Sequence, residues 1–180
     1  VVRRLSGGGA ILHDQEITYS LILPASHPTR HDPSSVYETV HRGIIELLTA
    51  GGFPCQLRSE FDALHFNEII SEHGDGAEPF LCFLRRNPND IVHQSGIKVV
   101  GSAQRRRKGV TLQHGSTILR ASALAPQVQG IEDLEPQCET DDFRRRLPDA
   151  IARGISHSIN VRNYTEAEKS LAAAIAIEMS

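Results

Sequence analysis

Apolar side chains recur every three to four residues between Ser35 and Gly52, the spacing that gives a helix one buried face. The positions are Val36, Val40, Ile44, Leu47 and Leu48. Ser35-Val36-Tyr37-Glu38 has the spacing of a capping box, and Gly51-Gly52 follows the last apolar position. The pattern predicts a helix that starts at Ser35 and stops at Gly51-Gly52, with His41 on its solvated side.

A different pattern, alternation of apolar and polar residues, predicts a strand over Ile17–Leu23. Turn residues divide residues 80–119 into further short β-rich runs. The other predicted strands are Ala10–Leu12, Phe53–Arg58, Phe80–Leu84, Asp90–His93, Ile97–Ser102, Val110–Gln113 and Thr117–Leu119. Their spacing suits an antiparallel or mixed sheet. The second half of residues 60–78 is predicted to be an exposed, mobile loop.

The C-terminal third is predicted to be helical. Phe143, Leu147, Ile151 and Ile155 are spaced by four, and Pro148 either kinks this helix or marks the first turn of a shorter one. Thr165-Glu166-Ala167-Glu168 is a second capping box, which opens an Ala-rich helix to Met179. Together the elements predict an α+β fold, a mixed and largely antiparallel sheet flanked by helices.

Length and composition narrow the class of protein. The 180 residues suit one domain over 1–180, and the start at Val1-Val2, which resembles a strand end, suggests that an N-terminal portion is lacking. A net charge of −3 argues against nucleic acid as a partner. No apolar run approaches the ~20 residues of a membrane helix, so no membrane partner is expected. Three scattered cysteines fit a reduced, cytoplasmic protein.

The segment Arg3–Asp14, RRLSGGGAILHD, is the strongest local signal for ligand binding. Three consecutive glycines let backbone N–H groups approach a ligand closely, and two arginines offer forked donors. The segment is predicted to form a nest for an anionic group, with a plain Gly-rich turn as the alternative. No Gly-Lys-Ser/Thr follows, so it is not a P-loop. His27 and His31 lack a third ligand nearby, and no metal site is predicted.

Several other residues leave two interpretations open. Cys82 is either a core thiol or a nucleophile, and Lys98 is either a buried, paired lysine or an edge lysine that faces water. His114 is either a turn residue or a site residue. The run Arg105–Lys108 is either a solvated turn or a docking patch for an acidic protein. Arg144-Arg145-Arg146 is predicted to be a solvated helix face.

Three motifs in order resemble one family, the lipoate-protein ligase A/octanoyltransferase family. They are Arg3–Asp14, the segment Gly96–Gln104 (GIKVVGSAQ), and the segment Leu112–Ser116 (LQHGS). The resemblance implies the fold of the biotin/lipoate ligase catalytic domain, which is related to class II aminoacyl-tRNA synthetases. It also implies attachment of octanoyl or lipoyl groups to a lysine of small acidic carrier domains, such as glycine cleavage H protein.

Two mechanisms exist within this family. Transferases take octanoate from acyl carrier protein onto a cysteine, whereas ligases activate lipoate with ATP and Mg²⁺. The Cys82-Phe83 pair matches the transferase nucleophile, and Gln104 matches the transferase pattern. The resemblance therefore favours a cysteine transferase without a tightly bound cofactor. An ATP-dependent ligase, in which Cys82 belongs to the core, and a truncated or non-catalytic carrier-binding relative are the alternatives.

The resemblance also implies which residues form the site. Cys82 would attack the donor thioester, and Lys98 would stabilise the developing oxyanion. The residues implied to bind substrate are Arg3, Arg4, Gly7, Gly8, Gly9, His13, Gly101, Ser102, Ala103, His114 and Gly115. The basic run Arg105–Lys108 would meet the acidic carrier.

Overall fold

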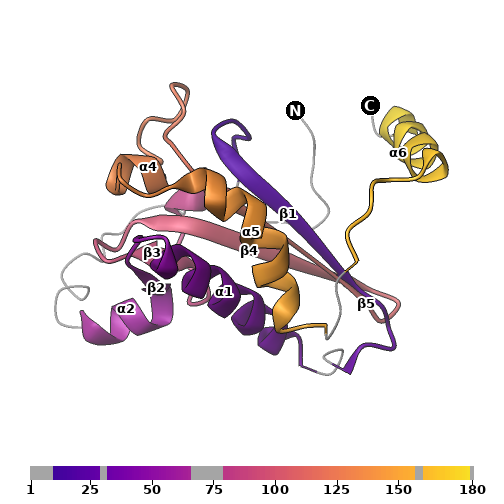
Figure 1. The fold of residues 1–180 in the computed structure, drawn as a ribbon, viewed down its shortest axis with the longest axis horizontal. Helices are drawn as coiled ribbons and strands as arrows, with labels where there is room; N and C mark the ends of the chain where they lie inside the picture. The colour runs from indigo at the N-terminus through magenta and orange to yellow at the C-terminus, as the bar shows by residue number, and fades with distance from the viewer. Residues whose placement is uncertain (1–9, 29–31, 66–78, 157–159, 179–180) are drawn as a thin grey trace.

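The computed structural model describes residues 10–28, 32–65, 79–156 and 160–178. Its centre is a five-stranded sheet in the order β1-β5-β4-β3-β2, in which every neighbouring pair of these strands is antiparallel (Figure 1). The strands are β1 (Glu16–Leu23), β2 (Cys55–Leu57), β3 (Ile91–His93), β4 (Lys98–Arg107) and β5 (Val110–Ile118). The α+β architecture with a largely antiparallel sheet is thereby confirmed.

The three longest strands form a continuous ribbon that carries most of the site. Tyr19 of β1 lies opposite Gly115 of β5, which in turn lies opposite Ser102 of β4. A Cβ at Gly115 would lie 2.3 Å from the Tyr19 ring, so only glycine leaves room for that ring. Two predicted strands, 110–113 and 117–119, are wrong as separate elements, because β5 runs unbroken through residues 114–116.

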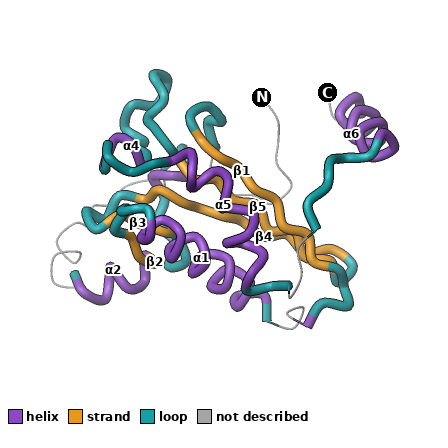
Figure 2. Tube along the Cα trace, viewed as in Figure 1, coloured by secondary structure: helices purple, strands orange, loops and turns teal. Residues whose placement is uncertain are grey.

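Two helices, α1 (Pro33–Ala50) and α5 (Thr140–Arg153), cover one face of the sheet (Figure 2). Their apolar residues pack with the sheet into one core, which includes Val40, Ile44, Leu48, Val100, Phe143 and Leu147. The helices approach closely at Gly43, where a Cβ would lie 2.3 Å from the Ala150 carbonyl oxygen. Pro148 lies inside α5, so it does not start a shorter helix.

The start of α1 differs from the prediction. The helix begins at Pro33, and Asp32 is its N-cap residue, because the Asp32 carboxylate accepts a hydrogen bond from the Ser35 N–H. The predicted end at Gly51 is confirmed. His41 is not on the solvated side: it is 1% exposed and belongs to the buried face.

Several short predicted elements also differ. The predicted strand Phe80–Leu84 is wrong, because Cys82–Leu84 form a one-turn 3-10 helix, η3. The predicted strand 10–12 is reduced to one parallel bridge between Ala10 and Leu81. The predicted strand Phe53–Arg58 shortens to β2, because Arg58 begins helix α2 (Arg58–Leu64). The predicted loop in the second half of residues 60–78 lies outside the described residues.

Within the described residues, the remaining α-helices are α4 (Ile131–Leu134) and α6 (Glu166–Glu178), and α6 stands apart from the sheet in Figure 1. The second capping box is confirmed. Glu168 N–H donates to the Thr165 hydroxyl, and Thr165 N–H donates to the Glu168 carboxylate at 2.8 Å. Among the described helices, none combines the length and the apolar character that crossing a membrane requires.

The close approach of α1 and α5 generates a stability prediction. Gly43→Ala should lower the free energy of unfolding by about 1–3 kcal/mol, because the added methyl collides with backbone and forces the helices apart. The sign is informative, since Gly→Ala inside a helix otherwise stabilises by about 1 kcal/mol. Urea denaturation measures the change. Gly51→Ala is the matched control, because its nearest neighbour atom would be 3.4 Å away. A stabilised Gly43→Ala protein would contradict the packing described.

Candidate functional site

A cleft of about 480 Å³ lies on the sheet face opposite α1 and α5. Side chains alternate along each strand, so residues next to the helix-facing Tyr19 and Ser102 point to the other face. The lining residues are Ile11, His13, Asp14, Glu16, Thr18, Tyr19, Ser20, Cys82, Phe83, Gly101, Ser102, Ala103, His114, Gly115 and Ser116. Segments far apart in the sequence therefore meet in one hollow.

Most of the predicted site residues meet in this cleft. Cys82, His13, His114 and the run Gly101–Ala103 all line it, together with Gly115. These residues come from three separate sequence motifs and from the Cys82-Phe83 pair, and the fold brings them together. Ser102 is a partial exception, because its side chain points to α1. Arg3, Arg4, Gly7, Gly8 and Gly9 lie outside the described residues.

Cys82 is half-buried and is presented on the short η3 turn. Backbone hydrogen bonds with Ala10 hold this segment in place. The Cys82 N–H donates to the Ala10 carbonyl at 2.8 Å, and the Ala10 N–H donates to the Phe80 carbonyl at 2.9 Å. Phe83 follows with its ring buried. The thiol is therefore held at the cleft wall by the segment that follows the Gly-rich motif.

Lys98 is buried, with 8% of its surface exposed, and its ammonium forms an ion pair with Asp90 at 2.9 Å. It also donates to the carbonyls of Cys82 at 3.2 Å and Arg85 at 3.4 Å. A lysine ammonium has three hydrogens, and these three acceptors match them. The edge-lysine alternative is wrong. The ammonium ties β4 directly to the turn that carries Cys82.

Gly101 has a specific reason to be glycine. A Cβ at this position would lie 2.7 Å from Lys98 Cε and 3.1 Å from its Nζ. The lysine side chain thus passes over Gly101 on the cleft face of β4. Any larger residue there would displace the ammonium from Asp90 and from the Cys82 carbonyl.

Asp90 is a site residue that the sequence interpretation missed. It is 3% exposed, and burial raises the pKa of its carboxyl, against the opposing effect of the Lys98 ammonium. The carboxylate also accepts the Asn87 N–H at 2.8 Å. Asn87-Pro88-Asn89 was interpreted only as a turn. The signal that could have identified Asp90 is an acidic residue directly before the apolar pair Ile91-Val92.

His41 is the second missed residue, and it lies behind the cleft. Its Nδ1 contacts the Asn89 carbonyl, and its Nε2 lies 2.8 Å from the Ser102 hydroxyl. Burial lowers the pKa of His41 to about 4, and the nearby Lys98 ammonium acts in the same direction. The ring is therefore neutral at neutral pH, with its Nδ1–H donating to Asn89.

The buried network continues from Ser102 across the sheet. Gln113 donates to the Tyr19 hydroxyl at 3.1 Å and accepts from Gln104 at 2.8 Å. Burial raises the pKa of Tyr19 to about 12, so its hydroxyl keeps its proton. Gln104, part of the predicted motif, thus faces the helices and not the cleft. Its function in the structure is to join β4 to β5.

At the other end of the cleft, Glu16 joins the two strands to the segment after the glycines. Its carboxylate contacts His13 Nδ1 and accepts a hydrogen bond from the Ser116 hydroxyl. Glu16 was also missed, because its partner Ser116 lies on β5, a hundred residues later in the chain. His13 is thereby fixed at the rim, and His114 lies in the middle of β5, not in a turn.

The other two thiols lie away from the cleft. Burial raises the pKa of the Cys55 thiol to about 12 and also raises the pKa of Cys138. Neither lines the cleft. Among the described residues, no group of three or more His, Cys, Asp or Glu side chains could hold a metal ion.

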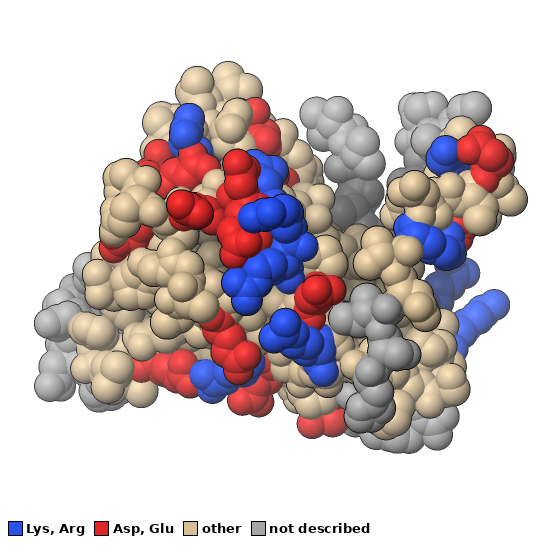
Figure 3. Space-filling model, viewed as in Figure 1, with Lys and Arg blue, Asp and Glu red and all other residues tan. Residues whose placement is uncertain are grey.

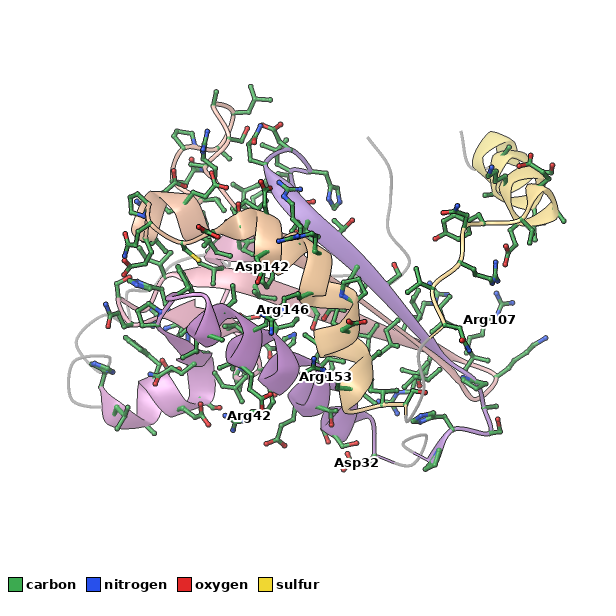
Figure 4. The ribbon with its side chains drawn as sticks, in the orientation of Figure 1. Asp32, Arg42, Arg107, Asp142, Arg146 and Arg153 are labelled. Atoms are coloured by element: carbon green, nitrogen blue, oxygen red, sulfur yellow. The ribbon has the colours of Figure 1, made fainter. Side chains whose placement is uncertain are left out.

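Arginines gather in two places. Arg105 and Arg107 share the cleft face of the β4–β5 hairpin, where Arg105 lies opposite Leu112 and Leu112 opposite Ile22, which is 66% exposed. Figure 4 shows Arg107 near the hairpin end, apart from Arg146 and Arg153 on α5. A run of basic side chains follows α5 in Figure 3, and there Arg145 and Arg146 pair with Asp142. The predicted solvated helix face is confirmed for these arginines.

Comparisons with known proteins match the chain to one family model and to relatives named octanoyltransferases. The family model for the lipoyl protein ligase A/B catalytic domain matches residues 1–151. Octanoyltransferase LipM of Brevibacillus brevis is 43% identical over 119 residues, and LipM of Bacillus subtilis is 38% identical over 121 residues. Each match covers 66% of this chain and 41% of the relative, so the chain spans about two fifths of those proteins.

Solved structures show the same fold. A Thermoplasma acidophilum protein with bound lipoic acid has a TM-score of 0.69 at 19% identity, covering 98% of this chain and 67% of its own. A lipoate-protein ligase A bound with ATP has a TM-score of 0.64 at 19% identity, covering 97% and 66%. These likenesses confirm the predicted biotin/lipoate ligase catalytic-domain fold.

The buried histidine generates a pH prediction. The unfolded chain protonates His41 near pH 6.5, whereas the folded chain does so only near pH 4. The contribution of neutral His41 is therefore intact above about pH 6.5 and is lost as the pH falls towards 4. At ~1.4 kcal/mol per pKa unit, the loss amounts to about 3 kcal/mol. Urea midpoints measured from pH 7.5 to 4 should fall more steeply for the native protein than for His41→Phe. Parallel curves would contradict the buried, neutral ring.

Proposed function

Because the chain belongs to the lipoyl protein ligase A/B catalytic-domain family, we propose that it is an octanoyl/lipoyl transferase. In this proposal it takes the acyl group from acyl carrier protein through a thioester on Cys82. It then passes the group to a lysine of a lipoyl carrier domain, such as that of glycine cleavage H protein. The observation that carries the proposal is the position of Cys82, which lines the cleft beside Lys98 instead of belonging to the core.

The reaction divides into two displacements. The Cys82 sulfur gives up its proton and attacks the carbonyl carbon of the donor thioester. A new C–S bond forms, the C–S bond to the donor breaks, and the proton leaves with the donor thiol. The acceptor lysine, as a neutral amine, then attacks the Cys82 thioester. An amide bond forms, the C–S bond breaks, and the proton from the amine returns to the Cys82 sulfur. No tightly bound cofactor takes part in either step.

Lys98 is proposed as the group that stabilises the negative oxygen in both steps. Its longest hydrogen bond, at 3.4 Å to the Arg85 carbonyl, is the one that an acyl oxygen can replace. Its bond to Cys82 keeps the ammonium beside the nucleophile. Its ion pair with Asp90 holds the lysine ammonium in place.

The cleft floor suits a thioester. Ala103 carries only a methyl group on this face, and the Lys98 side chain lies over Gly101, so the acyl carbonyl can approach the strand beside the ammonium. His114 and His13 are proposed to border the bound group. Arg3, Arg4 and the glycines at 7–9 are proposed to border the entrance of the acyl site. Ser102 and Gly115 are proposed to support the cleft floor from the helix-facing side of the sheet.

An ATP-dependent ligase is the alternative within this family, with ATP and Mg²⁺ as reactants. It treats Cys82 as a core residue, and the position of Cys82 on the cleft wall favours the transferase instead. A requirement for ATP would identify the ligase. A chain that modifies no carrier domain from either donor would be the non-catalytic relative.

Mass spectrometry of the intact protein after incubation with octanoyl-acyl carrier protein tests the proposal. We expect one octanoyl group on Cys82 and none on Cys82→Ser, whose transfer rate should fall at least about 10³-fold. Cys55→Ala is the matched control and should keep both the adduct and the rate, because Cys55 is half-buried like Cys82 but lies outside the cleft. Full activity of Cys82→Ser, or an adduct on another cysteine, would refute the nucleophile.

The hairpin arginines are proposed as part of the docking surface for the acidic carrier. They continue the cleft face of the sheet towards Ile22 and Val110, so a carrier seated there reaches the cleft with its acyl arm or its lysine. Charge complementarity steers such encounters and weakens with salt.

Arg107→Glu should raise KM for the carrier protein about tenfold while kcat changes little, and the effect should shrink at high salt. Steady-state kinetics with carrier protein as the varied substrate give the two constants. Arg145→Glu reverses the same charge on α5, on the opposite face, and should leave KM near the native value. Equal effects of the two substitutions would rule out a specific hairpin surface.

A further inference from the structure

His41 contacts the two segments that carry Lys98 and Asp90. These segments must be aligned for the ion pair between the two residues to form. One side of the His41 ring contacts the Asn89 carbonyl, which directly precedes Asp90. The other side lies 2.8 Å from the hydroxyl of Ser102, four residues after Lys98 on β4. One side chain from α1 thus contacts both the turn that carries Asp90 and the strand that carries Lys98.

The direction of these two bonds is fixed by chemistry. A carbonyl oxygen can only accept, so the Nδ1 that faces Asn89 carries the hydrogen. In the neutral ring Nε2 then has a lone pair, and it accepts the Ser102 hydroxyl hydrogen. Burial and the nearby Lys98 ammonium both oppose protonation of the ring. Each bond therefore has one defined donor and one defined acceptor.

The bond to Asn89 determines the orientation of Asp90 through a planar group. The Asn89 carbonyl and the Asp90 N–H belong to the same peptide plane. His41 holds the oxygen side of this plane, and the Asn87 carbonyl holds the Asp90 N–H at 2.9 Å. With the plane fixed on both sides, the Asp90 carboxylate points to Lys98 at 2.9 Å. Lys98 in turn reaches the Cys82 carbonyl.

We propose that His41 is a positioning residue for the reaction, acting through Asn89 and Asp90 to hold the Lys98 ammonium beside Cys82. His41 touches neither the substrate nor the reacting atoms. The catalytic consequence rests on the proposed acyl transfer, whereas the placement of Lys98 can be measured without it.

Other hydrogen bonds also hold the turn that carries Asp90. The test must distinguish their effect from the effect of His41. Two backbone bonds connect the turn to the start of α2: Arg58 N–H donates to the Asp90 carbonyl at 2.7 Å, and Ser59 N–H donates to the Pro88 carbonyl at 3.0 Å. They hold the turn against the sheet edge. Neither acts on the Asn89–Asp90 peptide plane, which is the plane that His41 holds.

Two substitutions separate the two ring nitrogens. In His41→Asn the side-chain amide can occupy the place of Nδ1 and donate to Asn89, but it does not reach Ser102. In His41→Gln the amide can occupy the place of Nε2 and accept from Ser102, but it leaves Asn89 without its donor. We expect His41→Asn to keep the rate of Cys82 acylation within about threefold. We expect His41→Gln to lower kcat about 10- to 100-fold with little change in KM.

Labelling of Lys98 provides the second measurement. The chain has three lysines, and Lys108 and Lys169 are exposed internal standards for an amine-reactive acetylating reagent. Peptide mass spectrometry should find Lys98 protected in the native protein and in His41→Asn, but labelled faster in His41→Gln. This result holds even if no octanoyl donor acylates Cys82, so failure of the proposed function and failure of this inference are distinguishable.

Tyr37→Phe is the matched control for a general loosening of α1 against the sheet. It removes a hydroxyl one helical turn before His41 and leaves both ring bonds intact. It should lower the melting temperature without changing acylation or Lys98 labelling. Equal losses in His41→Asn and His41→Gln, or Lys98 labelling that follows the melting temperature across all three variants, would overturn the proposal.

Discussion

The buried ion pair between Lys98 and Asp90 is the interaction on which the candidate site depends. Desolvating two charges is costly unless geometry and further hydrogen bonds offset the cost, and here both partners have them. The pair holds a strand, a turn and the η3 segment at one point. It also explains Gly101, since the lysine side chain occupies the space of its missing Cβ. Loss of either charge would leave the other buried and would release the Cys82 turn.

Because side chains alternate along each strand, the same strands contribute to both the core and the cleft. Along β4 and β5, one set of positions faces the helices and the next set faces the cleft. Gly115 belongs to the first set and leaves room for the Tyr19 ring, whereas Gly101 belongs to the second and leaves room for Lys98. The two glycines thus belong to opposite faces of the sheet, and each leaves room for a different side chain. A polar network behind the sheet therefore supports the cleft in front of it.

Sequence patterns identified what is local. The apolar stripe of α1, its end at Gly51 and the capping box at Thr165 each depend on residues within one or two turns. Asp90 and Glu16 were missed because Lys98 and Ser116, which they contact, lie on other strands. The strand predicted at Phe80–Leu84 failed because a short apolar run has no period that separates a strand from a turn. His41 was recoverable, since it lies four residues before Ile45 and seven before Leu48, on the buried stripe.

Beyond the local η3 turn, the contacts that position Cys82 span long stretches of sequence. Ala10 fixes its backbone, Lys98 fixes its carbonyl, and His41 acts on the turn that orients Asp90. None of these contacts forms within a single helix or hairpin, so the site exists only when α1, the sheet and the turn are assembled. Acid acts on the same assembly, because the pKa of His41 ties its neutral ring to the folded state. Folding and the geometry of the nucleophile are therefore parts of one cooperative transition.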